Sequence, residues 1–141
     1  MGRIVALDLG SKRVGVAVSD PLGLTAQGLA VVVRRADREF CAVIGRVLGE
    51  YDAERLIIGL PLALNGTEGP AAQTARQCAA SLEAALTVPV DLWDERLTTV
   101  QAERVMVDAG VRRAKRRANI DKLAAVLILQ SWLDAHRQEE T

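Results

Sequence analysis

The segment ALDLGSKRVGVAVSD, residues 6–20, shows how the fold of this protein begins. An apolar run over residues 4–9 is typical of a strand that is buried on both faces. Residues 10–13 have the composition of a turn, and the valine-rich residues 14–19 favour a second strand, so the short spacing predicts a β-hairpin. Asp8 lies near the end of the first strand, where a buried carboxylate needs a partner, a proton or a metal.

The rest of the chain adds strands and helices in a definite order. The expected strands are residues 29–34, 55–60 and 90–93, and the expected helices are residues 37–49, 70–86, 98–109 and 119–136. The order β-β-β-α-β-α-β-α-α predicts an α/β fold with a five-stranded mixed sheet that has helices on both faces.

Several residues mark the expected helix ends. Asp37 and Asn119 have the side chains of N-caps, and Thr98 with Gln101 resembles a capping box. Pro70 fits the first turn of its helix, and Gly49 suits a helix C-terminus.

Length and composition predict one domain. The chain has 141 residues, of which 50% are hydrophobic and 3% aromatic, so leucine, valine, isoleucine and alanine must form the core. We expect a single domain over residues 1–137 and a short tail over residues 138–141. Because 18 basic residues balance 18 acidic ones, the net charge predicts no partner.

The chain also lacks the signals of a membrane or secreted protein. No apolar run approaches the roughly 20 residues that a bilayer-spanning helix needs, and the N-terminus has no secretory pattern. Cys41 and Cys78 are expected to be free thiols in a reducing cytoplasm, with a disulfide or a metal pair as the alternative. His136 is the only histidine, which argues against a histidine-rich zinc site or a Ser-His nucleophile.

Three carboxylates lie at the ends of predicted elements. Asp8 ends the first strand, Glu95 follows the fifth, and Asp121 lies in the first turn expected for the last helix. Ligands gather at the carboxyl edge of parallel strands, and hard oxygen ligands suit Mg²⁺ or Mn²⁺. Two such ions about 4 Å apart promote phosphodiester hydrolysis without a histidine. Each acid also has a structural interpretation. Asp8 could form a turn, Glu95 could belong to an ion pair in a loop, and Asp121 could complement the helix dipole.

Basic and loop residues predict contacts with phosphate. A run with no acid supplies a local positive surface, and it consists of Arg112, Arg113, Lys115, Arg116 and Arg117. Lys12, Arg13 and Arg96 add to this surface. The NGTEG loop, which contains Asn65 and Thr67, precedes a helix whose backbone N–H groups suit an anion. The alternatives are a solvated basic loop and a plain turn.

Four segments together resemble one family: ALDLGSKRVGVAVSD, IIGLPLALNGTEGP, DERLTT and IDKLAAVLILQSWL. They are similar to the YqgF family, also called RuvX, whose members are described as pre-16S rRNA nucleases and as Holliday-junction-resolvase-like proteins. The resemblance implies a ribonuclease-H-like fold and metal-dependent hydrolysis of phosphodiester bonds. It also implies that Asp8, Glu95 and Asp121 are both the catalytic residues and the ligands of Mg²⁺ or Mn²⁺.

The related RuvC resolvases differ at one point. They carry a second aspartate one turn away in the last helix, whereas this chain has Ala118 and Ala124 there. Three acids therefore remain. The candidates for additional ligands of a second metal are Asp20, Asp94 and a substrate phosphate.

Alternatives remain at the level of function. The expected partner is nucleic acid, either precursor ribosomal RNA or branched DNA, with no membrane. A non-catalytic module that binds RNA or the ribosome is the second interpretation. A nucleotide-binding fragment is the third, because DLGSKRVG also resembles the phosphate hairpin of the actin-like superfamily. The last helix is apolar nearly all round over residues 120–133, which predicts either full burial or a homodimer contact.

Overall fold

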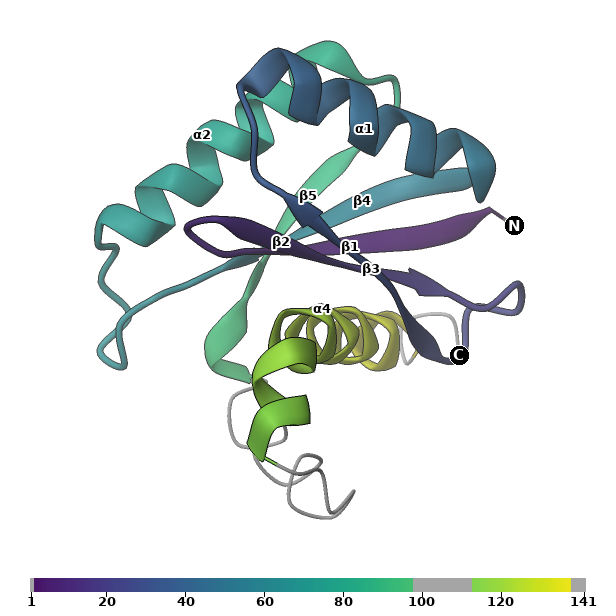
Figure 1. Cartoon of the computed structure of the whole chain (residues 1–141). Coiled ribbons are helices and arrows are strands. Elements are labelled where there is room, and N and C mark those ends of the chain that lie inside the picture. Colours follow the sequence, from purple (N-terminus) through teal and green to yellow (C-terminus); the bar gives the residue numbers. More distant parts are fainter. Residues whose placement is uncertain (1, 98–112, 138–141) are drawn as a thin grey trace.

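Five strands form the centre of the molecule (Figure 1). The computed structural model describes residues 2–97 and 113–137, and within these ranges the side chains of residues 2–96 and 122–136. The strands are β1 (Arg3–Leu9), β2 (Arg13–Ser19), β3 (Ala26–Val33), β4 (Ala53–Leu60) and β5 (Val90–Asp94). The helices are α1 (Asp37–Glu50), α2 (Pro70–Ala85), the 3₁₀ turn η1 (Glu95–Leu97) and α4 (Arg113–Arg137).

The sheet is mixed, with the strand order β3-β2-β1-β4-β5. Neighbouring strands β1 and β2, and β2 and β3, are antiparallel, as the predicted hairpin requires. Strand β4 lies parallel to both β1 and β5, so these three strands end at the same edge of the sheet. The predicted five-stranded mixed sheet is confirmed, and its parallel half positions the candidate site.

Each face of the sheet is covered by helices. Helices α1 and α2 lie on one face and α4 lies on the other (Figure 1). Alternate residues of β1 point to opposite faces, so Val5 and Leu7 join the core beneath α1 and α2 while Ile4 and Ala6 join the core beneath α4. Leu7 is fully buried, which explains the continuous apolar run in the sequence.

The last helix differs from the prediction at its start. Helix α4 begins at Arg113, six positions before the expected cap, so Asn119 lies within the helix and the cap prediction is wrong. Arginine, lysine and alanine are all good helix formers, and the segment between residues 113 and 118 contains only these three types. Apolar residues of α4 such as Leu129 and Leu133 are buried against the sheet, so packing within the chain accounts for them.

Smaller corrections concern other element ends. Ala36 is the N-cap of α1 and Asp37 is its first residue, without a side-chain capping bond, so Asp37 acts only as an acid in the first turn. Strand β3 begins three residues earlier than expected because Ala26 pairs with Ser19 at the end of β2. Pro70 does occupy the first turn of α2. The helix expected over residues 98–109 lies outside the described residues.

Two further expectations concern membranes and cysteines. Within the described ranges, no helix combines the length and apolar character that crossing a membrane requires. Cys41 and Cys78 are both free, as predicted, and burial raises the pKa of the Cys78 thiol to about 11. A thiol with such a pKa stays protonated and is a poor nucleophile or metal ligand.

Candidate active site

The carboxylate of Asp8 lies on the α4 face of the sheet, close to the carboxyl end of β1. Strand alternation gives Asp8 the same orientation as Ala6, which packs beneath α4. The parallel register pairs Leu7 with Ile58, so Asp8 comes next to Gly59 on the neighbouring strand β4. Asp8 is half-buried, which gives a carboxylate a rigid support and partial access to solvent.

Glu95 reaches the same place from the end of β5. The parallel pair Leu60 and Asp94 brings β5 to the carboxyl edge, and Glu95 begins the turn η1 directly afterwards. The Glu95 side chain folds back over Gly59 and forms a hydrogen bond with Asp8. Two of the three predicted acids, 87 positions apart in the chain, are therefore in contact.

This contact changes the electrostatics of Glu95. Partial burial, followed by the hydrogen bond and the negative charge of Asp8, raises the pKa of Glu95 to about 8. A carboxyl with this pKa is largely protonated at pH 7, and its proton bridges two groups that would otherwise repel each other. A divalent cation can replace the proton, because it also compensates two adjacent negative charges.

The hairpin that carries Asp8 is held tightly. The Gly10 backbone N–H donates to the Arg13 carbonyl over 2.8 Å. A Cβ atom at position 10 would lie 2.6 Å from that same carbonyl oxygen, so this turn requires glycine. Lys12 lies in the turn of the hairpin and Arg13 begins β2, and both side chains are exposed.

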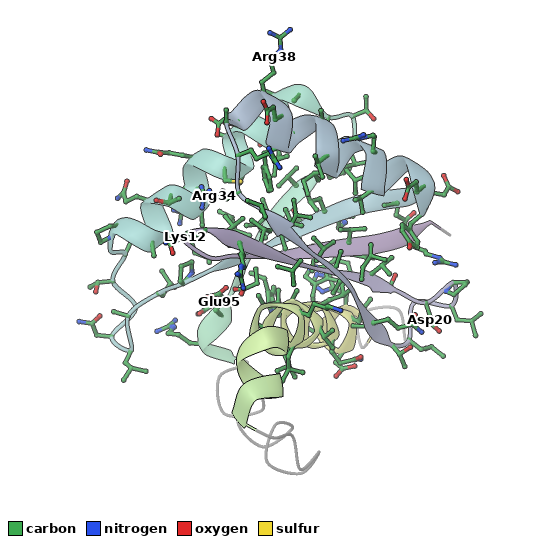
Figure 2. The ribbon with its side chains drawn as sticks, in the orientation of Figure 1. Lys12, Asp20, Arg34, Arg38 and Glu95 are labelled. Carbon is green, nitrogen blue, oxygen red and sulfur yellow. The ribbon has the colours of Figure 1, made fainter. Side chains whose placement is uncertain are left out.

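Arg34 is a basic residue of this region that the sequence analysis missed. Its guanidinium donates to the Gly10 carbonyl over 3.3 Å, and its backbone N–H donates to the Lys12 carbonyl over 2.8 Å. Figure 2 shows Arg34 and Lys12 on the same side of the molecule as Glu95. The only sequence signal was its place after a valine-rich strand, which does not reveal a partner in another turn.

Arg96 connects the site to the loop between β4 and α2. Its guanidinium binds the Asp94 carboxylate, with the shortest nitrogen–oxygen distance being 2.6 Å, and it also donates to the Leu64 carbonyl over 3.4 Å. Arg96 lowers the pKa of Asp94, mainly through their hydrogen bond. Asp94 is therefore an ion-pair partner, and the predicted phosphate contact of Arg96 has to compete with that pair.

The loop after β4 has its own internal bonds. Asn65 accepts hydrogen bonds from the backbone N–H and the hydroxyl of Thr67, at 3.1 and 2.7 Å. Both residues are exposed, and Gly69 precedes the first turn of α2. The loop that was predicted to bind an anion therefore lies beside Arg96, and its Asn65 and Thr67 side chains are hydrogen-bonded to each other.

Other predicted residues lie elsewhere or outside the description. Asp20 is at the opposite end of the sheet from Glu95 and accepts backbone bonds from Leu24 and Thr25, so it cannot supplement the site (Figure 2). Asp121 lies in α4, but its side chain falls outside the described residues. The same holds for Arg112 and for the side chains of Arg113, Lys115, Arg116 and Arg117.

The donor set suits a hard divalent cation. Asp8 and Glu95 offer carboxylate oxygens in contact, on a strand and at a strand end. Among the side chains that the structure describes, which exclude Asp121, no three acidic, cysteine or histidine residues form a metal-binding group. Two protein carboxylates plus waters and substrate phosphate is nevertheless the usual way in which proteins hold Mg²⁺.

Solved structures define the class of this fold. RuvC of T. thermophilus in complex with a Holliday junction substrate matches with a TM-score of 0.62 and 16% identity, covering 97% of this chain and 96% of that one. The fowlpox virus Holliday junction resolvase matches with a TM-score of 0.57 and 13% identity, over 94% of this chain and 99% of that one. The fold is thus ribonuclease-H-like.

Sequence comparison gives the family within this class. The model of RuvX, described as Holliday junction resolvase, matches residues 2–135. A protein of Myxococcus xanthus (strain DK1622), described as "Putative pre-16S rRNA nuclease", is 50% identical over 139 residues, covering 99% of this chain and 92% of its own. A Listeria monocytogenes protein with the same description is 50% identical over 134 residues, 94% of this chain and 97% of its own. The chain belongs to the RuvX family of nucleases.

Proposed function

We propose that this chain is a divalent-metal-dependent endonuclease that hydrolyses phosphodiester bonds in structured nucleic acid. The observation that carries the proposal is the contact between the Asp8 and Glu95 carboxyl groups at the carboxyl edge of the parallel strands. Without a cation, two carboxylates in contact repel each other, which costs free energy. A cation between or beside the two groups compensates their charge.

The proposed roles divide between the divalent cation and the residues of the chain. Bound Mg²⁺ or Mn²⁺ supplies Lewis-acid stabilisation of the phosphate and lowers the pKa of an attacking water. Asp8 holds its carboxylate fixed because it lies within a strand that is hydrogen-bonded on both sides. Glu95 accepts or releases a proton at its carboxyl group according to whether a cation is present, and Lys12 and Arg13 bind the nucleic-acid backbone.

Asp121 completes the proposed set from α4. The C-terminal part of α4 lies near the start of β1, as shown by Leu133 and Ile4, which line the same small cavity. Ile128 lies over Gly59 at the end of β4, so the helix runs towards the acidic edge in its N-terminal direction. Position 121 lies seven residues before Ile128, about two turns nearer the N-terminus of α4. This placement supports Asp121 as the third carboxylate.

The substrate follows from the relatives rather than from the geometry. Relatives at 50% identity carry the description "Putative pre-16S rRNA nuclease", which favours processing of that precursor in the bacterial cytoplasm. The family description and the likeness to RuvC favour branched DNA as a second substrate. Branched DNA has two symmetric strands to cut, so that role also requires two active sites, which a homodimer supplies.

Metal removal is the first test of the proposed activity. We expect purified protein to cleave precursor 16S rRNA or a four-way DNA junction with Mg²⁺ or Mn²⁺, to lose cleavage in excess EDTA, and to recover it when Mn²⁺ is restored. The measurement is the rate of product formation on a denaturing gel. Tight binding without cleavage under either metal would instead identify a non-catalytic RNA-binding module.

Lys12 provides a test of the nucleic-acid surface. We expect Lys12→Ala to raise KM by about three- to tenfold and leave kcat nearly unchanged, because loss of one phosphate contact weakens binding uniformly. The slope of log affinity against log salt should fall by about one unit. Arg38→Ala is the matched control, since Arg38 is exposed on α1 and points away from Glu95 (Figure 2). Equal effects of the two substitutions would remove Lys12 from the interface.

A further inference from the structure

Gly59 is the penultimate residue of β4, and its missing side chain leaves the space that Glu95 occupies. Strand alternation aims position 59 towards α4, because its neighbours Ile58 and Leu60 belong to the core on the opposite face. A Cβ atom at position 59 would overlap the Glu95 Oε1 atom and lie 2.9 Å from Glu95 Cγ and 2.6 Å from Ile128 Cδ1. All three contacts are closer than real Cβ atoms show.

We propose that Gly59 is a positioning residue for the active site, because only a residue without Cβ lets the Glu95 carboxylate lie over β4 and meet Asp8. The inference rests on the proposed nuclease function and adds a residue to it. Gly59 has no side chain that could touch substrate or metal, so it acts only through the placement of Glu95.

The register explains why this space controls the pair. Asp8 lies beside position 59 on the adjacent parallel strand, and both positions face α4. Glu95 must cross β4 to reach Asp8, since β4 lies between β1 and β5 in the sheet. The shortest route lies directly over Gly59. Any Cβ there pushes the carboxylate outward into solvent and away from its partner.

A packing role is the alternative, because Ile128 would also meet the added methyl group. Ile128 is 1% exposed, so it cannot swing away as a surface side chain can. The two roles separate if the contact to Ile128 is relieved while the contact to Glu95 is kept. Ile128→Val does this, because valine lacks the Cδ1 atom that lies 2.6 Å from the added Cβ.

The experiment compares wild type, Ile128→Val, Gly59→Ala and the Gly59→Ala/Ile128→Val double variant. Each is measured for Tm, for Mn²⁺ affinity by calorimetry in the absence of substrate, and for kcat and KM. Gly49→Ala is the control, since Gly49 is exposed near the end of α1 and a Cβ there meets no atom within 4 Å.

We expect Gly59→Ala to lower kcat by about a hundredfold with KM changed less than about threefold, which is the effect of a misplaced reacting group. Mn²⁺ affinity should fall at least about tenfold. The double variant should regain the Tm of Ile128→Val while kcat and Mn²⁺ affinity stay low. Gly49→Ala should match wild type in Mn²⁺ affinity, kcat and KM, with a Tm that is equal or slightly higher because alanine is the better helix former.

Recovery of kcat and Mn²⁺ affinity together with Tm in the double variant would show that Gly59 serves packing alone. Failure of the double variant to fold would also overturn the inference, since a displaced Glu95 by itself leaves the core intact. Absence of cleavage by wild type would count against the proposed function, whereas the Mn²⁺ comparison would still decide the role of Gly59.

Discussion

Asp8→Asn is expected to abolish cleavage while the protein remains folded. We expect kcat/KM to fall by at least about 10³-fold, which corresponds to roughly 4 kcal/mol of lost transition-state stabilisation. The physical reason is that asparagine keeps the shape of aspartate and loses its charge, so Glu95 loses the carboxylate with which it would share the metal. The measurement is the rate of cleavage with Mg²⁺ and with Mn²⁺, together with circular dichroism to establish the fold.

Asp20→Asn is the matched control for that substitution. Asp20 has the same chemistry but lies at the other end of the sheet, where it accepts backbone hydrogen bonds from Leu24 and Thr25 (Figure 2). We expect Asp20→Asn to retain wild-type cleavage. Full activity in folded Asp8→Asn protein would remove Asp8 from the mechanism and leave the hairpin with a structural role only.

Glu95→Gln is expected to stabilise the metal-free protein at pH 8 and to abolish its activity. Glutamine keeps the length of Glu95 and can donate a hydrogen bond to Asp8, as a protonated carboxyl does, without adding negative charge. At pH 8 the wild-type protein must either bind a proton at Glu95 or hold two carboxylates in contact, and both cost free energy. We expect stabilisation on the order of 2 kcal/mol after allowing for solvent screening, seen as a Tm higher by several degrees.

The pH dependence of this difference follows from linkage. The pKa of Glu95 is raised in the folded protein from 4.5 to about 8, so the folded state holds the proton more tightly than the unfolded state does. The resulting stability is fully present below pH 4.5 and is lost as pH rises towards 8. Glu95→Gln should therefore match wild type near pH 4.5 and exceed it increasingly up to pH 8. A Tm difference that does not change with pH would contradict this account of the pair.

Much of the fold followed from local sequence patterns. The apolar run through Leu7 predicted a strand that is buried on both faces, and the short turn at Gly10 predicted the hairpin. Parallel strands end at the same edge, so the arrival of Asp8 and Glu95 at one edge of the sheet could be expected from the order of the elements. These features depend on neighbouring residues or on the order of the elements, and both can be recognised in a single sequence.

Other features depend on contacts between distant segments. The hydrogen bond from Arg34 to Gly10 and the pairing of Arg96 with Asp94 need side-chain directions that no periodicity encodes. The space at Gly59 had a signal that was overlooked, since a single glycine inside a strand pattern indicates a close approach. The predicted start of α4 is wrong because arginine, lysine and alanine in the basic run are strong helix formers as well as a source of charge.

Anomalous diffraction at the manganese edge from crystals of the protein grown with Mn²⁺ tests the central claim most directly. We expect a peak within coordination distance of oxygens from both Asp8 and Glu95, at the carboxyl edge of β1 and β5 and over the Gly59 position. The same peak should be lost in Asp8→Asn crystals. Manganese bound elsewhere, or none bound between these carboxylates at millimolar concentration, would contradict the proposed metal-dependent hydrolysis.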